Sequence, residues 1–159
     1  MPATISNLQL ETYFLKEISY AVKNNLETIP ETASEIEPVG LEIADLTTPL
    51  EENGWRCELV IKSTDNGKDE NPFYNFRIVM VGFFKVNSDL PTEYAQALAE
   101  SNCPAILYST SREIIATVTR RSPYPAVLLP LVTFVKVGEK PKTTEKSKTT
   151  KKPTKKKSA

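Results

Sequence analysis

The stretch from Phe73 to Val86 constrains the fold more than any other, because it is apolar at both its even and its odd positions. The even positions hold Tyr74, Phe76, Ile78, Met80, Phe84 and Val86, an alternation that is typical of a β-strand. The odd positions carry Phe73, Val79, Val81 and Phe83 among polar residues. A small sheet covers only one of its faces with its own core. We therefore expect the second apolar face to meet a helix, another subunit or a ligand.

Three further segments have the pattern of strands. Leu8 to Val22 carries most of its large apolar residues at even positions, with Tyr13 and Leu15 among the polar residues at odd ones. A second strand is predicted to begin at Val39, and Trp55 to Lys62 alternates cleanly. Asn53-Gly54 and Asp65-Asn66-Gly67 are typical of tight hairpin turns. The sequence thus predicts four consecutive strands. The first two are separated by an ordered loop from Asn24 to Pro38, and tight turns join the others.

The period changes after the fourth strand. Helix formers dominate from Tyr94 to Glu100, and Pro104 is expected to open a longer helix that reaches about Arg121. The prolines that follow favour an extended apolar segment with the sequence PYPAVLLPLVTF. Strands followed by helices predict an α+β fold, a four-stranded antiparallel sheet with helices packed on one face.

Charge divides the chain into two parts. Residues 1–135 have a net charge of −8, whereas residues 136–159 contain ten lysines and two glutamates, a net charge of +8. Residues 1–139 are therefore expected to form one domain, and residues 140–159 a disordered Lys-rich tail. The tail has no aromatic residue and no arginine, which makes nucleic acid an unlikely ligand. It suits either solubilisation or an electrostatic contact.

Several classes of protein are disfavoured by what the sequence lacks. There is no histidine, the commonest general base, and no glycine-rich phosphate loop, so we do not expect an enzyme. The two cysteines give no disulfide framework, and neither a metal nor a cofactor is expected. Without a secretory signal or an apolar stretch long enough to span a membrane, the expected location is the cytoplasm.

The stretch from Asn102 to Phe134 contains Cys103-Pro104, Arg112-Glu113 and Leu129-Pro130. In these residues and their order it resembles the SecB family of protein-export chaperones. The family has Cys-Pro-x-Ile-Leu-Phe, then Ala-Arg-Glu, then a Phe-Pro-containing run that ends in Leu-x-Pro-x-Asn-Phe. This sequence matches at Cys103, Pro104, Ile106, Leu107, Arg112, Glu113, Pro125, Leu129, Pro130 and Phe134. Tyr108 and Tyr124 replace phenylalanines, and Thr133 replaces the asparagine. The segments Lys16 to Tyr20 and Gly82 to Phe84 resemble family strands in the same order.

The resemblance implies an ATP-independent holdase, assembled as a dimer of dimers, that binds unfolded client polypeptides. It also implies delivery of export precursors to the SecA motor through an acidic surface. This surface is only partly present: Glu17 is retained, whereas Ala21 and Arg77 fall where export SecB has glutamates. A SecB-like chaperone of a toxin–antitoxin module is one alternative. An adaptor or nucleic-acid-associated protein that acts through its basic tail is another.

Apolar character in loops and at strand edges selects the candidate site residues. The predicted peptide-binding residues are Phe14, Leu26, Ile29, Ile36, Leu41, Tyr124, Val127, Leu128 and Phe134. The predicted residues of the oligomer interface are Phe83, Cys103, Leu107 and Ile114. Cys103 could also be imagined as a nucleophile at a helix N-terminus, but a small buried residue is the preferred interpretation.

Overall fold

The computed structural model describes residues 5–23, 40–64 and 73–135. These contain four strands, β1 (Leu8–Val22), β2 (Leu41–Pro49), β3 (Gly54–Ser63) and β4 (Tyr74–Val86), and one helix, α1 (Thr92–Thr119). The predicted α+β class is confirmed, as are all four strands. Val39, where the second strand was predicted to begin, and the Lys-rich tail lie outside the described residues.

The four strands form one antiparallel sheet in the order β1-β4-β3-β2. β2 and β3 form a hairpin whose turn places Glu52 and Asn53 at positive φ, next to Gly54. An asparagine adopts this conformation more readily than most residues, which explains the Asn-Gly signal. The first strand in the chain returns to lie beside the last, so β1 and β2 are the two edges.

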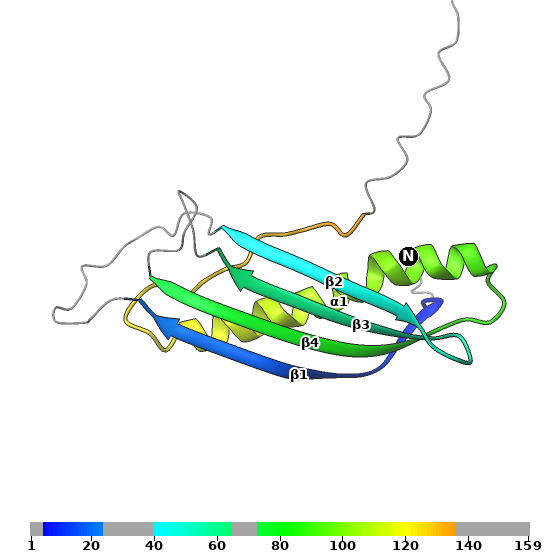
Figure 1. The fold of residues 1–159 in the computed structure, drawn as a ribbon, viewed down its shortest axis with the longest axis horizontal. Coiled ribbons are helices and arrows are strands. Elements are labelled where there is room, and N and C mark those ends of the chain that lie inside the picture. Colours follow the sequence, from blue (N-terminus) through cyan, green and yellow to red (C-terminus); the bar gives the residue numbers. More distant parts are fainter. Residues whose placement is uncertain (1–4, 24–39, 65–72, 136–159) are drawn as a thin grey trace, which may run out of the picture.

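Helix α1 covers one face of the sheet, as Figure 1 shows, and leaves the other face open. The core lies between them. β3 contributes Trp55, Cys57, Leu59 and Ile61, β4 contributes its even-numbered residues, and α1 contributes Ala99, Cys103, Leu107, Tyr108 and Ile115. The alternation read from the sequence of β3 and β4 therefore identifies the buried face correctly.

The prediction of two separate helices is wrong. One helix runs through Pro104, although a proline inside a helix removes a backbone hydrogen bond and costs about 3 kcal/mol. The sequence suggested a boundary because Pro104 is tolerated best in a first turn. Burial opposes that cost here, since Ala99, Cys103 and Leu107 are fully buried on both sides of the proline. A continuous helix keeps all three against the sheet.

Two register shifts in β1 overturn the prediction that its even positions share one face. The pairing with β4 shifts between Leu10 and Thr12 and again between Leu15 and Glu17. Each shift inserts one extra residue, as in a β-bulge, and exchanges the faces of the residues that follow. Tyr13 and Leu15 therefore face α1 together with Leu10 and Ile18, whereas Phe14 faces the open side.

The segment after α1, residues 120–135, packs back along the helix and is held by side-chain hydrogen bonds. The Val127 amide donates to Thr119 Oγ1 (2.9 Å), Arg112 Nε donates to the Leu129 carbonyl (3.0 Å), and the Tyr108 hydroxyl donates to the Pro130 carbonyl (2.8 Å). The segment forms no strand, so these bonds satisfy backbone groups that would otherwise be unpaired.

At Gly82 the sheet lies close to Leu107 of α1. A Cβ built at Gly82 would lie 2.7 Å from Phe84 Cε2 and 2.9 Å from Leu107 Cδ2. We expect Gly82→Ala to lower the free energy of unfolding by about 1–3 kcal/mol, because overpacking displaces a ring and a helix. Urea denaturation followed by circular dichroism measures the change. An unchanged midpoint for Gly82→Ala would contradict the tight approach.

Candidate peptide-binding surfaces

An apolar stripe runs along β1 on the side that faces α1. It consists of Leu10, Tyr13, Leu15 and Ile18, which are 39%, 47%, 40% and 38% exposed. Their partners on β4 are Phe84, Gly82, Met80 and Ile78, all on the helix-facing side of the sheet. We call these four residues the β1 stripe. Because β1 is an edge strand, the stripe lies beside a row of backbone groups that no strand of this chain pairs among the described residues.

A second apolar surface is formed by residues 120–135. Tyr124, Val127 and Leu129 point into the core, whereas Leu128 and Leu131 are 74% and 85% exposed. Phe134 packs edge-on against Tyr108, with ring centroids 5.8 Å apart. An extended segment that alternates in this way presents a row of apolar side chains that can bind another chain.

A pocket of about 390 Å³ adjoins the end of this segment, and we call it the β2 pocket. It is lined by Asp45, Leu46, Thr47, Glu100, Thr133, Phe134 and Val135. Edge strand β2, helix α1 and the C-terminal segment thus meet there. Two carboxylates beside apolar side chains suit a peptide that combines apolar and basic residues.

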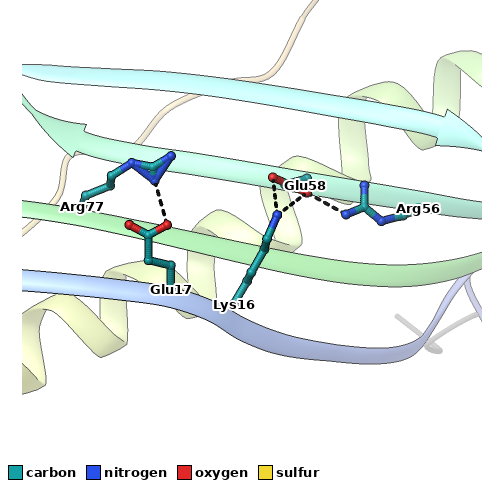
Figure 2. Close-up of polar contacts among 5 residues, drawn as sticks. All are labelled: Lys16, Glu17, Arg56, Glu58 and Arg77. Atoms are coloured by element: carbon teal, nitrogen blue, oxygen red, sulfur yellow. Dashed lines mark hydrogen bonds and ion pairs between the residues drawn. The ribbon is translucent and has the colours of Figure 1, made fainter.

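The open face of the sheet carries ion pairs instead of a free acidic surface. Figure 2 shows Lys16 of β1 reaching across β4 to Glu58 of β3, with Arg56 on the other side of the same carboxylate. The N···O distances are 3.2 Å and 2.6 Å, and the two hydrogen-bonded cations lower the pKa of Glu58. Arg77 Nη1 lies 3.4 Å from Glu17, the predicted motor contact. Basic residues of the chain itself therefore offset both glutamates.

Two apolar residues of β4 on the open face are buried without a partner chain. Val79 and Val81 are only 2% and 1% exposed within the single chain. Their neighbours on the adjacent strands include Phe14, Glu17, Glu58 and Val60. The inference that this second face must meet a helix, a subunit or a ligand is therefore wrong for these two residues.

The described members of the predicted peptide-binding set lie on several parts of the fold. Leu128 and Phe134 lie on the C-terminal segment, and Leu41 lines a separate pocket at β2. Phe14 is on the opposite face of the sheet, whereas Tyr124 and Val127 belong to the core. Leu26, Ile29 and Ile36 lie outside the described residues. The β1 stripe was missed, although Tyr13 and Leu15 at odd positions were the signal that could have revealed it.

The predicted interface residues are also divided. Cys103 and Leu107 have no exposed surface within one chain, Ile114 is half-buried against the core, and Phe83 is half-buried on the open face.

Burial raises the pKa of Cys57 to about 11 and that of Cys103 to about 12. Both thiols therefore stay protonated at neutral pH, which makes them poor nucleophiles.

No helix in the described parts of the chain is long and apolar enough to cross a membrane. Among the described residues, no group of three or more metal-binding side chains gathers in one place.

Comparison with known proteins defines the class to which this fold and these surfaces belong. A model of the family described as "Preprotein translocase subunit SecB" matches residues 2–144. A protein-export protein SecB of Acidithiobacillus ferrooxidans is 26% identical over 142 residues, covering 89% of this chain and 93% of the relative. The Haemophilus ducreyi protein of the same name is 29% identical over 129 residues, covering 80% and 73%.

A solved structure shares the fold. The SecB-like chaperone of Mycobacterium tuberculosis, in complex with a ChAD peptide from the HigA1 antitoxin, superposes with a TM-score of 0.52 at 13% identity. The match covers 79% of this chain and 87% of the mycobacterial chain. The protein is thus a chaperone of the four-stranded α+β type. It belongs to the SecB family.

Proposed function

We propose that this chaperone is an ATP-independent holdase that binds unfolded polypeptides, in particular precursors for protein export, in the cytoplasm. The observation that carries the proposal is the exposed apolar row of Leu128 and Leu131, which continues into the β2 pocket with its carboxylates. Exposed apolar side chains on an extended segment bind clients by burial, at roughly 25 cal/mol per Å² before the cost of ordering. The names of the curated relatives support export as the purpose.

We also propose a division of labour between the two apolar surfaces. The β1 stripe serves assembly, because it joins four partly exposed apolar residues to a 15-residue edge strand. Pairing through such an edge adds backbone hydrogen bonds to apolar burial. The resulting pairs are the first step towards a dimer of dimers. The C-terminal segment and the β2 pocket remain available for clients.

Binding to the SecA motor through the open face has less support. Glu17 is ion-paired with Arg77, and Glu58 with Lys16 and Arg56. A basic partner would have to displace these cations from the two glutamates. The ion pairs that it formed in exchange would be exposed to water and would add little to the binding free energy. The fold shared with a chaperone bound to an antitoxin peptide favours a toxin–antitoxin role as the second candidate.

The test of the proposed function is suppression of aggregation in the absence of nucleotide. We expect the full chain to keep a reduced, unfolded α-lactalbumin soluble at a near-stoichiometric ratio, and to ignore the folded, disulfide-bonded form. Light scattering measures aggregation and size-exclusion chromatography detects the complex. Equal binding to the folded protein, or a requirement for ATP, would contradict the holdase proposal.

A further inference from the structure

The β2 pocket lies where the described part of the chain ends. Thr133, Phe134 and Val135 form part of its lining, and Asp45 and Glu100 bring two carboxylates to it from β2 and α1. Asp45 pairs with Leu59 of β3 and therefore points to the helix side of the edge strand, towards α1. Because Val135 lines the pocket, residues 136–159 are attached next to the carboxylates of Asp45 and Glu100.

The sequence that follows has the opposite charge. Residues 136–159 contain ten lysines and two glutamates, and nine of the lysines come after Glu139. Lys140 is five residues beyond Val135, and an extended chain spans about 3.5 Å per residue, so every lysine of the tail can return to the pocket. A short tether also gives the tail a local concentration that reaches the millimolar range.

We propose that the Lys-rich tail, residues 140–159, docks over the β2 pocket of its own chain and competes there with basic clients. The proposal rests on the proposed function, because it assigns the tail to the same surface that clients use. The tail lysines lie against Asp45 and Glu100, and the tail covers the apolar lining formed by Leu46 and Phe134. The tail thereby lowers the apparent affinity of weak basic clients for the pocket. Clients that bind mainly through apolar residues displace the tail more easily.

Salt controls this competition. The contacts between the tail and the pocket are ion pairs at the surface, which are screened when the Debye length falls to about 8 Å at physiological ionic strength. Binding of an apolar client depends much less on salt. Docking of the tail is therefore strongest in dilute buffer and is lost as the salt concentration rises.

The experiment titrates a fluorescein-labelled peptide of alternating lysine and leucine into three proteins at 10 mM and 300 mM NaCl. The proteins are the full chain, a chain that ends at Glu139, and a full-length chain whose nine lysines after Glu139 are glutamine. At low salt we expect the truncated and the glutamine-tailed proteins to bind the peptide about threefold to tenfold more tightly than the full chain, since exposed ion pairs change affinity by small factors. The three affinities should converge at high salt.

The glutamine-tailed protein tests whether the charge of the tail or its mere presence blocks the pocket. If truncation improves binding but the glutamine tail does not, the tail blocks the pocket without ion pairs, and the proposal would be overturned. In the Asp45→Asn/Glu100→Gln background, truncation should no longer change the affinity. A zero-length carbodiimide cross-linker should join tail lysines to Asp45 or Glu100 at low salt. Cross-links confined to other carboxylates, or formed only between isotopically distinct chains, would contradict docking within one chain.

Failure of the inference is distinguishable from failure of the proposed function. Equal affinities of the three proteins at low salt would reject the docked tail while the holdase function stands. Absence of peptide binding by all three would reject the proposed function itself.

Discussion

Replacing Leu15 and Ile18 with aspartate is expected to lower the solution mass of the protein at least twofold, towards the 17.8 kDa of a single chain. Both side chains belong to the β1 stripe and are about 40% exposed, so each carboxylate can remain in water in the separated chain. In the assembly the same carboxylates would be buried without a partner, which costs several kcal/mol for each charge. Multi-angle light scattering at micromolar concentration measures the mass.

The matched control is Phe14→Asp. Phe14 is 47% exposed on the same strand, but the register shift at Glu11 and the pairing with Val81 place it on the open face. We expect this variant to keep the mass of the wild type and an unchanged circular dichroism spectrum. Dissociation of Phe14→Asp together with an intact Leu15→Asp/Ile18→Asp assembly would move the interface to the open face and refute the assignment of the β1 stripe.

The second large effect is expected in client capture. Replacing Leu128 and Leu131 with serine removes the two most exposed leucines of the segment 120–135. Full burial of a leucine is worth about 1.5–3 kcal/mol, and incomplete burial of two leaves about 2 kcal/mol in sum, or about a thirtyfold weaker Kd for an unfolded client. Fluorescence anisotropy with a labelled, reduced client measures the change.

Tyr94→Ser provides the comparison for this experiment. Tyr94 is 72% exposed, close to the 74% of Leu128, but it lies in the first turn of α1 and does not line the β2 pocket. We expect its Kd to change less than twofold. An equal loss of client affinity in the Tyr94→Ser and the Leu128→Ser/Leu131→Ser variants would indicate that any exposed apolar residue contributes to binding, and would contradict a defined client surface.

Most of the sheet could be predicted from the sequence because alternation and turn residues are local signals. Trp55 to Lys62 and the Asn53-Gly54 turn lie as expected. The faces of β1 could not be predicted, because a bulge depends on how that strand pairs with β4 and not on its own composition. The continuity of α1 through Pro104 likewise depends on burial against the sheet, which overrides a local preference.

The candidate site was predicted less well for a related reason. Apolar residues after the helix could be recognised as a set, but the direction of each one depends on the hydrogen bonds that the segment accepts from Arg112 and Tyr108 and donates to Thr119. With these bonds in place Val127 is buried and Leu128 is exposed. The sequence alone does not show which residues of this segment face the core, because the bonds join it to distant positions of α1.

The two edges of the sheet differ, and this difference limits how far the sheet can grow. β1 is 15 residues long and carries the apolar stripe, whereas β2 is 9 residues long and its middle residues line the pocket with the C-terminal segment. Joining two chains edge to edge through β1 uses the same surface on both and leaves only β2 at either end. Such a pair uses both copies of the β1 edge, so pairing through β1 cannot continue into a fibre. A chaperone that binds unfolded, aggregation-prone chains can in this way keep its edge strand β1 from pairing with strands of those chains.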